Sequence, residues 1–358
     1  MKKILCACLA MMLLVGCHKA KESVQEQTNN DAATMNSFDD SYYKIINVSS
    51  AGSELRENFY LGYGTSGDFQ TIGRGLQILS SDYFSTSNHY MSEGNYLKLA
   101  LKNEMESRKS ENSIQPPSGS TIGGVKDPVM VQNVQEQDYY VKDGNKYTLK
   151  GMAFAIIIDP RDSGNARLET PMSQSDIESF GRECISKFYN VIQKHEDFKK
   201  VKDVPVLITI YRATDATSST IDGNYILKSY CQKEVGEISK INHENVLFTS
   251  ERAEEIDKTT YADFNAIKTS LKNTATEAAG FVGEARYVDG EIQSMLITAN
   301  LNVKTYTELM ALTSLIADGI DNKFTYDFPV KVLVKSQDQL QAIVVKEKGG
   351  SAKSWDLY

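Results

Sequence analysis

Residues 147–158 (YTLKGMAFAIII) decide the fold of the body of the chain, because so long an apolar run rich in β-branched side chains predicts a buried strand. Lys142-Asp143-Gly144-Asn145 precedes it as a hairpin signal and joins it to a strand at 139–141. Ser175-Asp176-Ile177-Glu178 follows as a capping box that starts a helix. Residues 204–211 (VPVLITIY) then predict another buried strand, with its proline near the start. The predicted inward face of the helix carries Ile177, Phe180, Cys184, Phe188, Val191 and Ile192.

The same order of elements returns near the C-terminus. Asp289-Gly290 is a second hairpin signal, and residues 292–303 (IQSMLITANLNV) are the long strand that follows it. Thr305-Tyr306-Thr307-Glu308 is a second capping box, and residues 328–334 (FPVKVLV) repeat the proline-led strand. An offset of roughly 125 to 145 residues between the copies favours duplication of one unit. The alternative is that strand-strand-helix-strand is a common arrangement of α+β proteins and occurs here twice independently.

We therefore predict an α+β fold with two duplicated strand-strand-helix-strand units, mainly antiparallel sheets and a small mixed N-terminal unit. Residues 251–274 predict one continuous helix before the second unit. The predicted division of the chain is a signal peptide at 1–16, a lipidated flexible tether at 17–41, the N-terminal unit at 42–102, a linker or loop at 103–136, the first unit at 137–247, and a helix plus the second unit at 248–358.

The N-terminus, residues 1–17 (MKKILCACLAMMLLVGC), has the organisation of a lipoprotein signal peptide. Two lysines precede an apolar segment at 4–15, and the segment ends in Leu14-Val15-Gly16-Cys17, which is a lipobox. We expect the signal peptidase to recognise Leu14, Val15 and Gly16, and a diacylglycerol to be attached to the sulfur of Cys17. The alternative is a transmembrane anchor, but crossing a bilayer takes about 20 apolar residues and this run is shorter.

Composition limits the classes of partner. A chain with 41% hydrophobic and 24% charged residues has a normal globular composition. Its formal net charge of −8 does not suit nucleic acid as a partner, since binding nucleic acid requires a basic face. We expect lipoprotein-processing enzymes and the membrane, through the lipid on Cys17, as partners, which places the body on the extracellular face of the cell membrane. Residues 184 and 231 are cysteines that could form a disulfide, but two buried thiols are the favoured interpretation.

Residues that could carry catalysis do not form a recognised set. The chain has four histidines without zinc-type spacing, and it has no Gly-x-Ser-x-Gly motif. We therefore predict no enzyme activity, no cofactor and no metal site. An exported hydrolase is disfavoured for the same reason, whereas a module that binds an extracellular ligand of unknown identity is consistent with this composition.

Several short motifs together resemble the CamS-type sex pheromone lipoprotein precursors of Gram-positive bacteria. They are Tyr42-Tyr43-Lys44, Gly75-Leu76-x-x-Leu79-Ser80, Phe84, Tyr90, Glu93-Gly94-x-x-Leu97, Glu136-Gln137-Asp138-Tyr139, residues 264–268 and Gly280-Phe281-Val282-Gly283. Each motif is short, but their order along most of the mature chain is specific. The resemblance implies a surface lipoprotein whose signal peptide is the source of a short secreted pheromone.

In that family the pheromone heptapeptide lies directly before the lipidated cysteine. The corresponding residues here are Ala10, Met11, Met12, Leu13, Leu14, Val15 and Gly16. This peptide has paired methionines and a terminal glycine, where peptides of the family have an internal aromatic residue and usually end in alanine or serine. The resemblance leaves the role of the mature body open. The competing hypothesis is an extracellular ligand-binding lipoprotein with an ordinary signal peptide.

Overall fold

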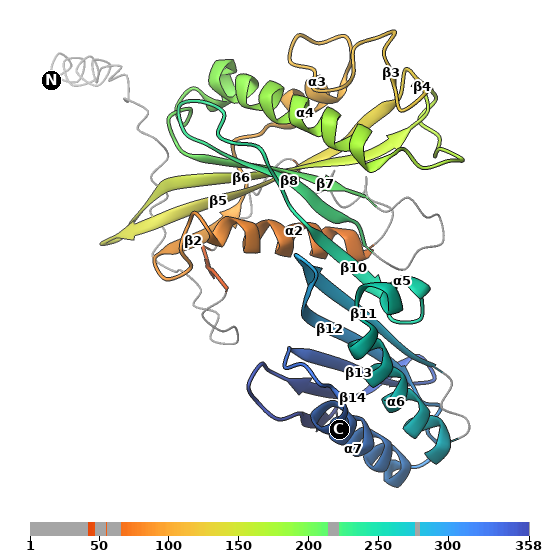
Figure 1. The fold of residues 1–358 in the computed structure, drawn as a ribbon. Coiled ribbons are helices and arrows are strands. Elements are labelled where there is room, and N and C mark those ends of the chain that lie inside the picture. Colours follow the sequence, from red (N-terminus) through yellow and green to blue (C-terminus); the bar gives the residue numbers. More distant parts are fainter. Residues whose placement is uncertain (1–41, 47–54, 56–65, 214–221, 276–279, 358) are drawn as a thin grey trace, which may run out of the picture.

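The computed structural model describes residues 42–46, 55, 66–213, 222–275 and 280–357 (Figure 1). The signal peptide, the lipobox, the candidate heptapeptide and the tether predicted at 1–41 lie outside the described residues. Within the described part, none of the helices is both long and apolar enough to cross a membrane.

A seven-stranded sheet forms the larger part of the molecule. Its strand order is β1-β2-β5-β6-β7-β8-β9. The β1/β2 and β6/β7 pairs are parallel and the other neighbours are antiparallel. Its strands are β1 (Lys44–Ile45), β2 (His89–Glu93), β5 (Val129–Asp143), β6 (Lys146–Arg161), β7 (Val206–Arg212), β8 (Asn224–Cys231) and β9 (Ser239–Lys240).

Helices cover both faces of this sheet. Figure 1 shows α4 (Gln174–Lys194) and α3 (Leu99–Glu106) on one face and α2 (Ser66–Ser81) on the other. Along β6, Phe154 and Ile156 belong to the core beneath α4, whereas Ala155 and Ile157 belong to the core beneath α2. Because both faces are buried, the strand reads as a continuous apolar run instead of an alternating one. A short 3-10 helix, η1 (Glu196–Phe198), follows α4.

A second sheet of six strands has helices on one face. Its order is β10-β11-β12-β13-β14-β15, and α6 (Lys258–Thr274) and α7 (Tyr306–Lys323) pack on it (Figure 1). Along β12, Met295 and Ile297 are buried while Leu296 between them is 40% exposed, so alternate side chains point away from the helices. The strands are β10 (His243–Leu247), β11 (Gly280–Val288), β12 (Glu291–Asn300), β13 (Val330–Ser336), β14 (Gln339–Lys346) and β15 (Lys353–Asp356).

The predicted α+β class and both predicted hairpins are confirmed. The β11/β12 turn places Asp289 and Gly290 at positive φ of 51° and 81°, as a two-residue hairpin of this kind requires. Cys184 and Cys231 are free and buried, in agreement with the favoured interpretation. Burial in the apolar core raises the pKa of the Cys184 thiol.

The structure differs from the predicted division of the chain in three places. Residues 42–102 form no separate unit, because β1 and β2 extend the seven-stranded sheet and α2 covers its face. Residues 103–136 are only partly a loop. They hold a hairpin of β3 (Thr121–Ile122) and β4 (Val125–Lys126) and the first half of β5. Strand β10, expected in the first unit, pairs with β11 in the second sheet.

Two helix boundaries also differ from the prediction. The cap of α4 is Ser173, whose Oγ accepts a hydrogen bond from the backbone N–H of Asp176 at 3.2 Å, so the predicted Ser175 is not the cap. The helix predicted at 251–274 is interrupted at Asp257 into α5 (Glu251–Ile256) and α6. The Asp257 carboxylate accepts a hydrogen bond from Thr260 N–H at 2.9 Å and therefore starts α6. The predicted Thr305 cap of α7 is confirmed, because its Oγ1 accepts from Glu308 N–H at 3.1 Å.

Candidate functional site

A groove of about 870 Å³ lies where the two sheets meet. Figure 1 shows α2 close to the ends of β11 and β12 in this region. Asn245 on β10 ties the two parts together. Its backbone N–H donates to Asn224 Oδ1 and its side-chain amide donates to Gly223 O, both at 2.9 Å. Ligand pockets typically measure about 300–1,000 Å³, so this groove has the size of a binding site.

The groove carries positive charge in a chain that is acidic overall. Arg74 on α2, Arg286 on β11 and Lys331 on β13 line it, and none of the described residues that line it is Asp or Glu. The Arg74 guanidinium lies 4.0 Å from the ring centroid of Tyr42, a cation–π contact. Within the described part of the chain, the guanidinium of Arg286 has no acidic or hydrogen-bonding partner. Burial, and then repulsion from Arg74, lower the pKa of Arg286.

His243 on β10 also lines the groove. Burial, and then the positive charge of Arg286, lower the pKa of His243 to about 4. The imidazole is therefore neutral at physiological pH and can both donate and accept a hydrogen bond. Next to the groove, the carboxylate of Asp222 accepts a hydrogen bond from Thr71.

Side-chain amides supply the remaining polar groups. Gln137 on β5 donates from Nε2 to Gly73 O at 2.9 Å and accepts from the Tyr139 hydroxyl at 2.9 Å. Two other amide atoms in the described structure are buried without a hydrogen-bond partner, namely Gln77 Nε2 and Gln135 Oε1. Gln77 is only 7% exposed and lines the groove together with Gln135. An unpaired buried polar atom costs about 1–3 kcal/mol, so these two atoms lower the stability of the fold at this wall.

Helix α2 is held tightly against the sheet beneath the groove. A Cβ on Gly75 would lie 2.4 Å from the Tyr225 ring, so only glycine allows this approach. The Tyr225 hydroxyl donates to Ile72 O at 2.6 Å. The wall of the groove formed by α2 is therefore rigid, and the glycine of the Gly75-Leu76 motif has a structural reason.

Two other motifs of the resemblance meet on the opposite face of the sheet. Glu136 is buried and accepts from the backbone N–H of Leu97 at 2.9 Å, and Asp138 accepts from that of Asn95 at 3.1 Å. Burial raises the pKa of Glu136 to about 7. Burial, and then the neighbouring charge of Glu136, hold the pKa of Asp138 well above its usual range. This acid pair fixes the loop before α3 and lies outside the groove.

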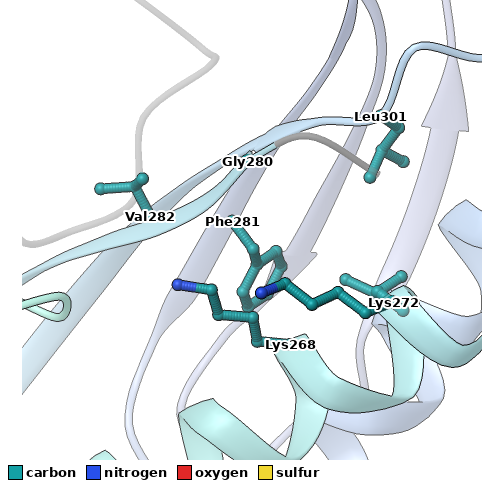
Figure 2. A pocket seen from close by; sticks show the side chains of 7 residues that line it. Lys268, Lys272, Gly280, Phe281, Val282 and Leu301 are labelled. Carbon is teal, nitrogen blue, oxygen red and sulfur yellow. The ribbon is translucent and has the colours of Figure 1, made fainter. Parts of the chain in front are cut away.

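A smaller pocket of about 200 Å³ lies between α6 and β11. Figure 2 shows the side chains of Lys268 and Lys272 extending from α6 beside Phe281. The volume is below the range of about 300–1,000 Å³ that is typical of ligand sites. The groove is therefore the stronger candidate.

Sequence reasoning did not identify the groove residues. All the predicted site residues lie at 10–17, outside the described part of the chain. One signal was present, because residues 135–138 (QEQD) are consecutive polar residues that lead into the apolar hairpin. Polar side chains in a strand covered on both faces are costly unless they pair or serve a site.

The fold is shared with sex pheromone precursors of known structure. The sex pheromone precursor from Lactobacillus salivarius subsp. salivarius UCC118 matches with a TM-score of 0.78 at 20% identity, over 93% of this chain and 99% of that chain. The C-terminal domain of the sex pheromone staph-cAM373 precursor from Staphylococcus aureus matches with a TM-score of 0.66 at 18% identity, over 83% of this chain and 98% of that chain.

The family is established by sequence. The CamS sex pheromone cAM373 precursor family matches residues 53–352, and this chain belongs to that family. The resemblance drawn from the sequence motifs is therefore confirmed. No functionally curated protein matches the sequence.

Proposed function

We propose that the chain is a lipid-anchored surface protein and the precursor of a secreted peptide. The lipobox supports the anchor, because Cys17 would carry the diacylglycerol and Leu14, Val15 and Gly16 would direct cleavage. Membership in the sex pheromone precursor family supports the release of residues 10–16 from the cleaved signal.

The anchor is tested by the substitution Cys17→Ala. Both the acyl acceptor and the cleavage site depend on this thiol, so the variant should stay uncleaved and unlipidated. Metabolic labelling with a palmitate analogue should mark the wild type and leave the variant unmarked. Label on the variant would contradict the anchor at Cys17.

The peptide is tested by mass spectrometry of the culture supernatant. The heptapeptide AMMLLVG (residues 10–16) should be found in cells that express the wild-type chain. It should be absent in the Cys17→Ala strain, where the signal is not cleaved. Detection of only longer or shorter fragments in the wild type would refute this release site.

The mature body is proposed to act as an extracellular binding module. The observation that carries this proposal is the groove, which has the volume of a ligand site and is lined by Arg74, Arg286 and Lys331 without an acidic residue among the described ones. A bound anionic ligand would compensate these positive charges. A ligand that binds only the folded state also stabilises it by mass action, which makes binding measurable as a rise in Tm.

A thermal-shift screen with two matched variants tests the binding module. Leu296→Trp would fill the groove, because Leu296 lines it and is 40% exposed. Leu340→Trp is the control, because Leu340 is 37% exposed on the same sheet and does not line the groove. A groove ligand should raise the Tm of the wild type and of Leu340→Trp only. Ligands that stabilise both variants equally would contradict a site in the groove.

We also propose that the two parts of the body arose by duplication. The order of strand pairings supports it. In each sheet, six consecutive strands pair antiparallel, antiparallel, parallel, antiparallel and antiparallel with their next neighbours. These strands are β2-β5-β6-β7-β8-β9 in the first sheet and β10-β11-β12-β13-β14-β15 in the second. Helices α4 and α7 occupy the same place, before the second strand of the parallel pair. Superposing the two series should bring α4 onto α7, and a helix on the opposite face would contradict a common origin.

A further inference from the structure

Charge in the groove is arranged for an anion. Arg74 and Arg286 come from different parts of the body, and both line the groove close enough to repel each other. Like charges brought together at a half-buried place destabilise the protein unless an anion compensates them. In the described structure no carboxylate pairs with Arg286. A planar guanidinium presents parallel N–H donors that match a carboxylate.

Another polar group in the lining can pair with the rest of the ligand. The neutral imidazole of His243 lines the groove and can both donate and accept a hydrogen bond. A peptide backbone offers the complementary pair, since each of its residues carries one carbonyl acceptor and one N–H donor.

Apolar side chains complete the lining. Ile45 on β1, Met91 on β2 and the half-exposed Leu296 on β12 border the groove. Methionine adapts to ligands of varied shape, so these walls suit aliphatic side chains more than a polar chain.

We propose that the groove binds a short apolar peptide by its carboxyl end, with Arg74 and Arg286 receiving the terminal carboxylate. This inference rests on the proposed role of the body as a binding module, and it names the ligand class. The chain itself contains such a molecule, because residues 10–16 (AMMLLVG) are uncharged in their side chains and gain a free carboxylate on release.

Fluorescence anisotropy with synthetic peptides tests the proposal. The probe is AMMLLVG with a neutral nitrobenzoxadiazole label on its N-terminus, and the matched probe carries a C-terminal amide in place of the carboxylate. The full-length protein is extracted from membranes in detergent. The wild type should bind the free acid at least tenfold more tightly than the amide, because only the acid offers the anion.

Two arginine variants separate the site from general charge effects. Arg286→Gln should bind the acid and the amide with equal affinity, and Arg74→Gln should reduce the preference. Arg252→Gln is the control, because Arg252 is an exposed arginine paired with Glu244 away from the groove, and it should keep the tenfold preference. Circular dichroism of each variant should match the wild type.

Three other results of the peptide-binding assay would each refute a different part of the proposal. If the wild type binds the acid and the amide equally and Leu296→Trp binds neither, the groove is still a binding site, but the proposed carboxylate site is refuted. Failure of both peptides, together with Arg286-dependent binding of inorganic phosphate, would refute a peptide ligand. Failure of all probes, together with no groove ligand in the thermal-shift screen, would refute both the ligand class and the binding module.

Discussion

The acid pair Glu136 and Asp138 makes the stability of the fold dependent on pH. Glu136 is 6% exposed and Asp138 is fully buried, and their carboxylates hold the backbone N–H groups of residues 95–97. Burial raises the pKa of Glu136 from its usual 4.5 to about 7. Bonds from the Leu97 and Tyr96 backbone and the charge of Lys98 act in the opposite direction and are outweighed.

A raised carboxyl pKa means that the folded state binds a proton that the unfolded state has released. The stability gained from this proton is therefore complete below pH 4.5 and is lost as the pH rises through about 7. At about 1.4 kcal/mol per pH unit, the interval from 4.5 to about 7 corresponds to a loss on the order of 3 kcal/mol in the free energy of unfolding.

The variant Glu136→Gln tests this prediction. Glutamine is neutral at every pH and keeps one oxygen that can accept from the loop, so the part of the stability loss that Glu136 causes between pH 5 and 8 should disappear. Only the part caused by Asp138, whose pKa is also raised by burial, should remain. Urea unfolding at a series of pH values measures it. Glu104→Gln, an exposed position on α3, is the matched control and should follow the wild-type curve. The reasoning fails if Glu136→Gln loses as much stability as the wild type over this range.

Two further predictions concern the stability of the body and are measured by urea unfolding. Ser173→Ala removes the α4 cap and should cost about 1 kcal/mol, whereas Ser175→Ala should change stability far less. A larger loss of stability in Ser175→Ala than in Ser173→Ala would show that Ser175 is the cap. Gly151→Ala places a Cβ 2.2 Å from the Phe84 ring and should cost about 1–3 kcal/mol by overpacking. Gly280→Ala, where the Cβ meets only Asn300 at 3.6 Å, is its control, and equal losses would show that Phe84 moves aside freely.

Sequence reasoning located individual elements well because periodicity and turn chemistry are local. The apolar spacing of residues 177–192 predicted the buried face of α4, and Asp289-Gly290 predicted a hairpin. It placed the α4 cap two residues too late because Ser173 and Ser175 are both serines ahead of the same apolar face. It also continued one helix through Asp257, because the apolar pattern persists across a residue whose side chain starts a new helix.

The sequence by itself determined the long strands β6 and β12, the proline-led strands β7 and β13, helices α4 and α7 and both hairpins, and its ordered motifs indicated the family. Only the tertiary structure decided that β10 joins the second sheet and that Arg74 and Arg286 share a groove. The physical reason is that strand partners and site walls depend on contacts between residues far apart in the chain. Local propensity carries no information about such contacts. The unpaired amides of Gln77 and Gln135 likewise became recognisable only once the fold had buried them.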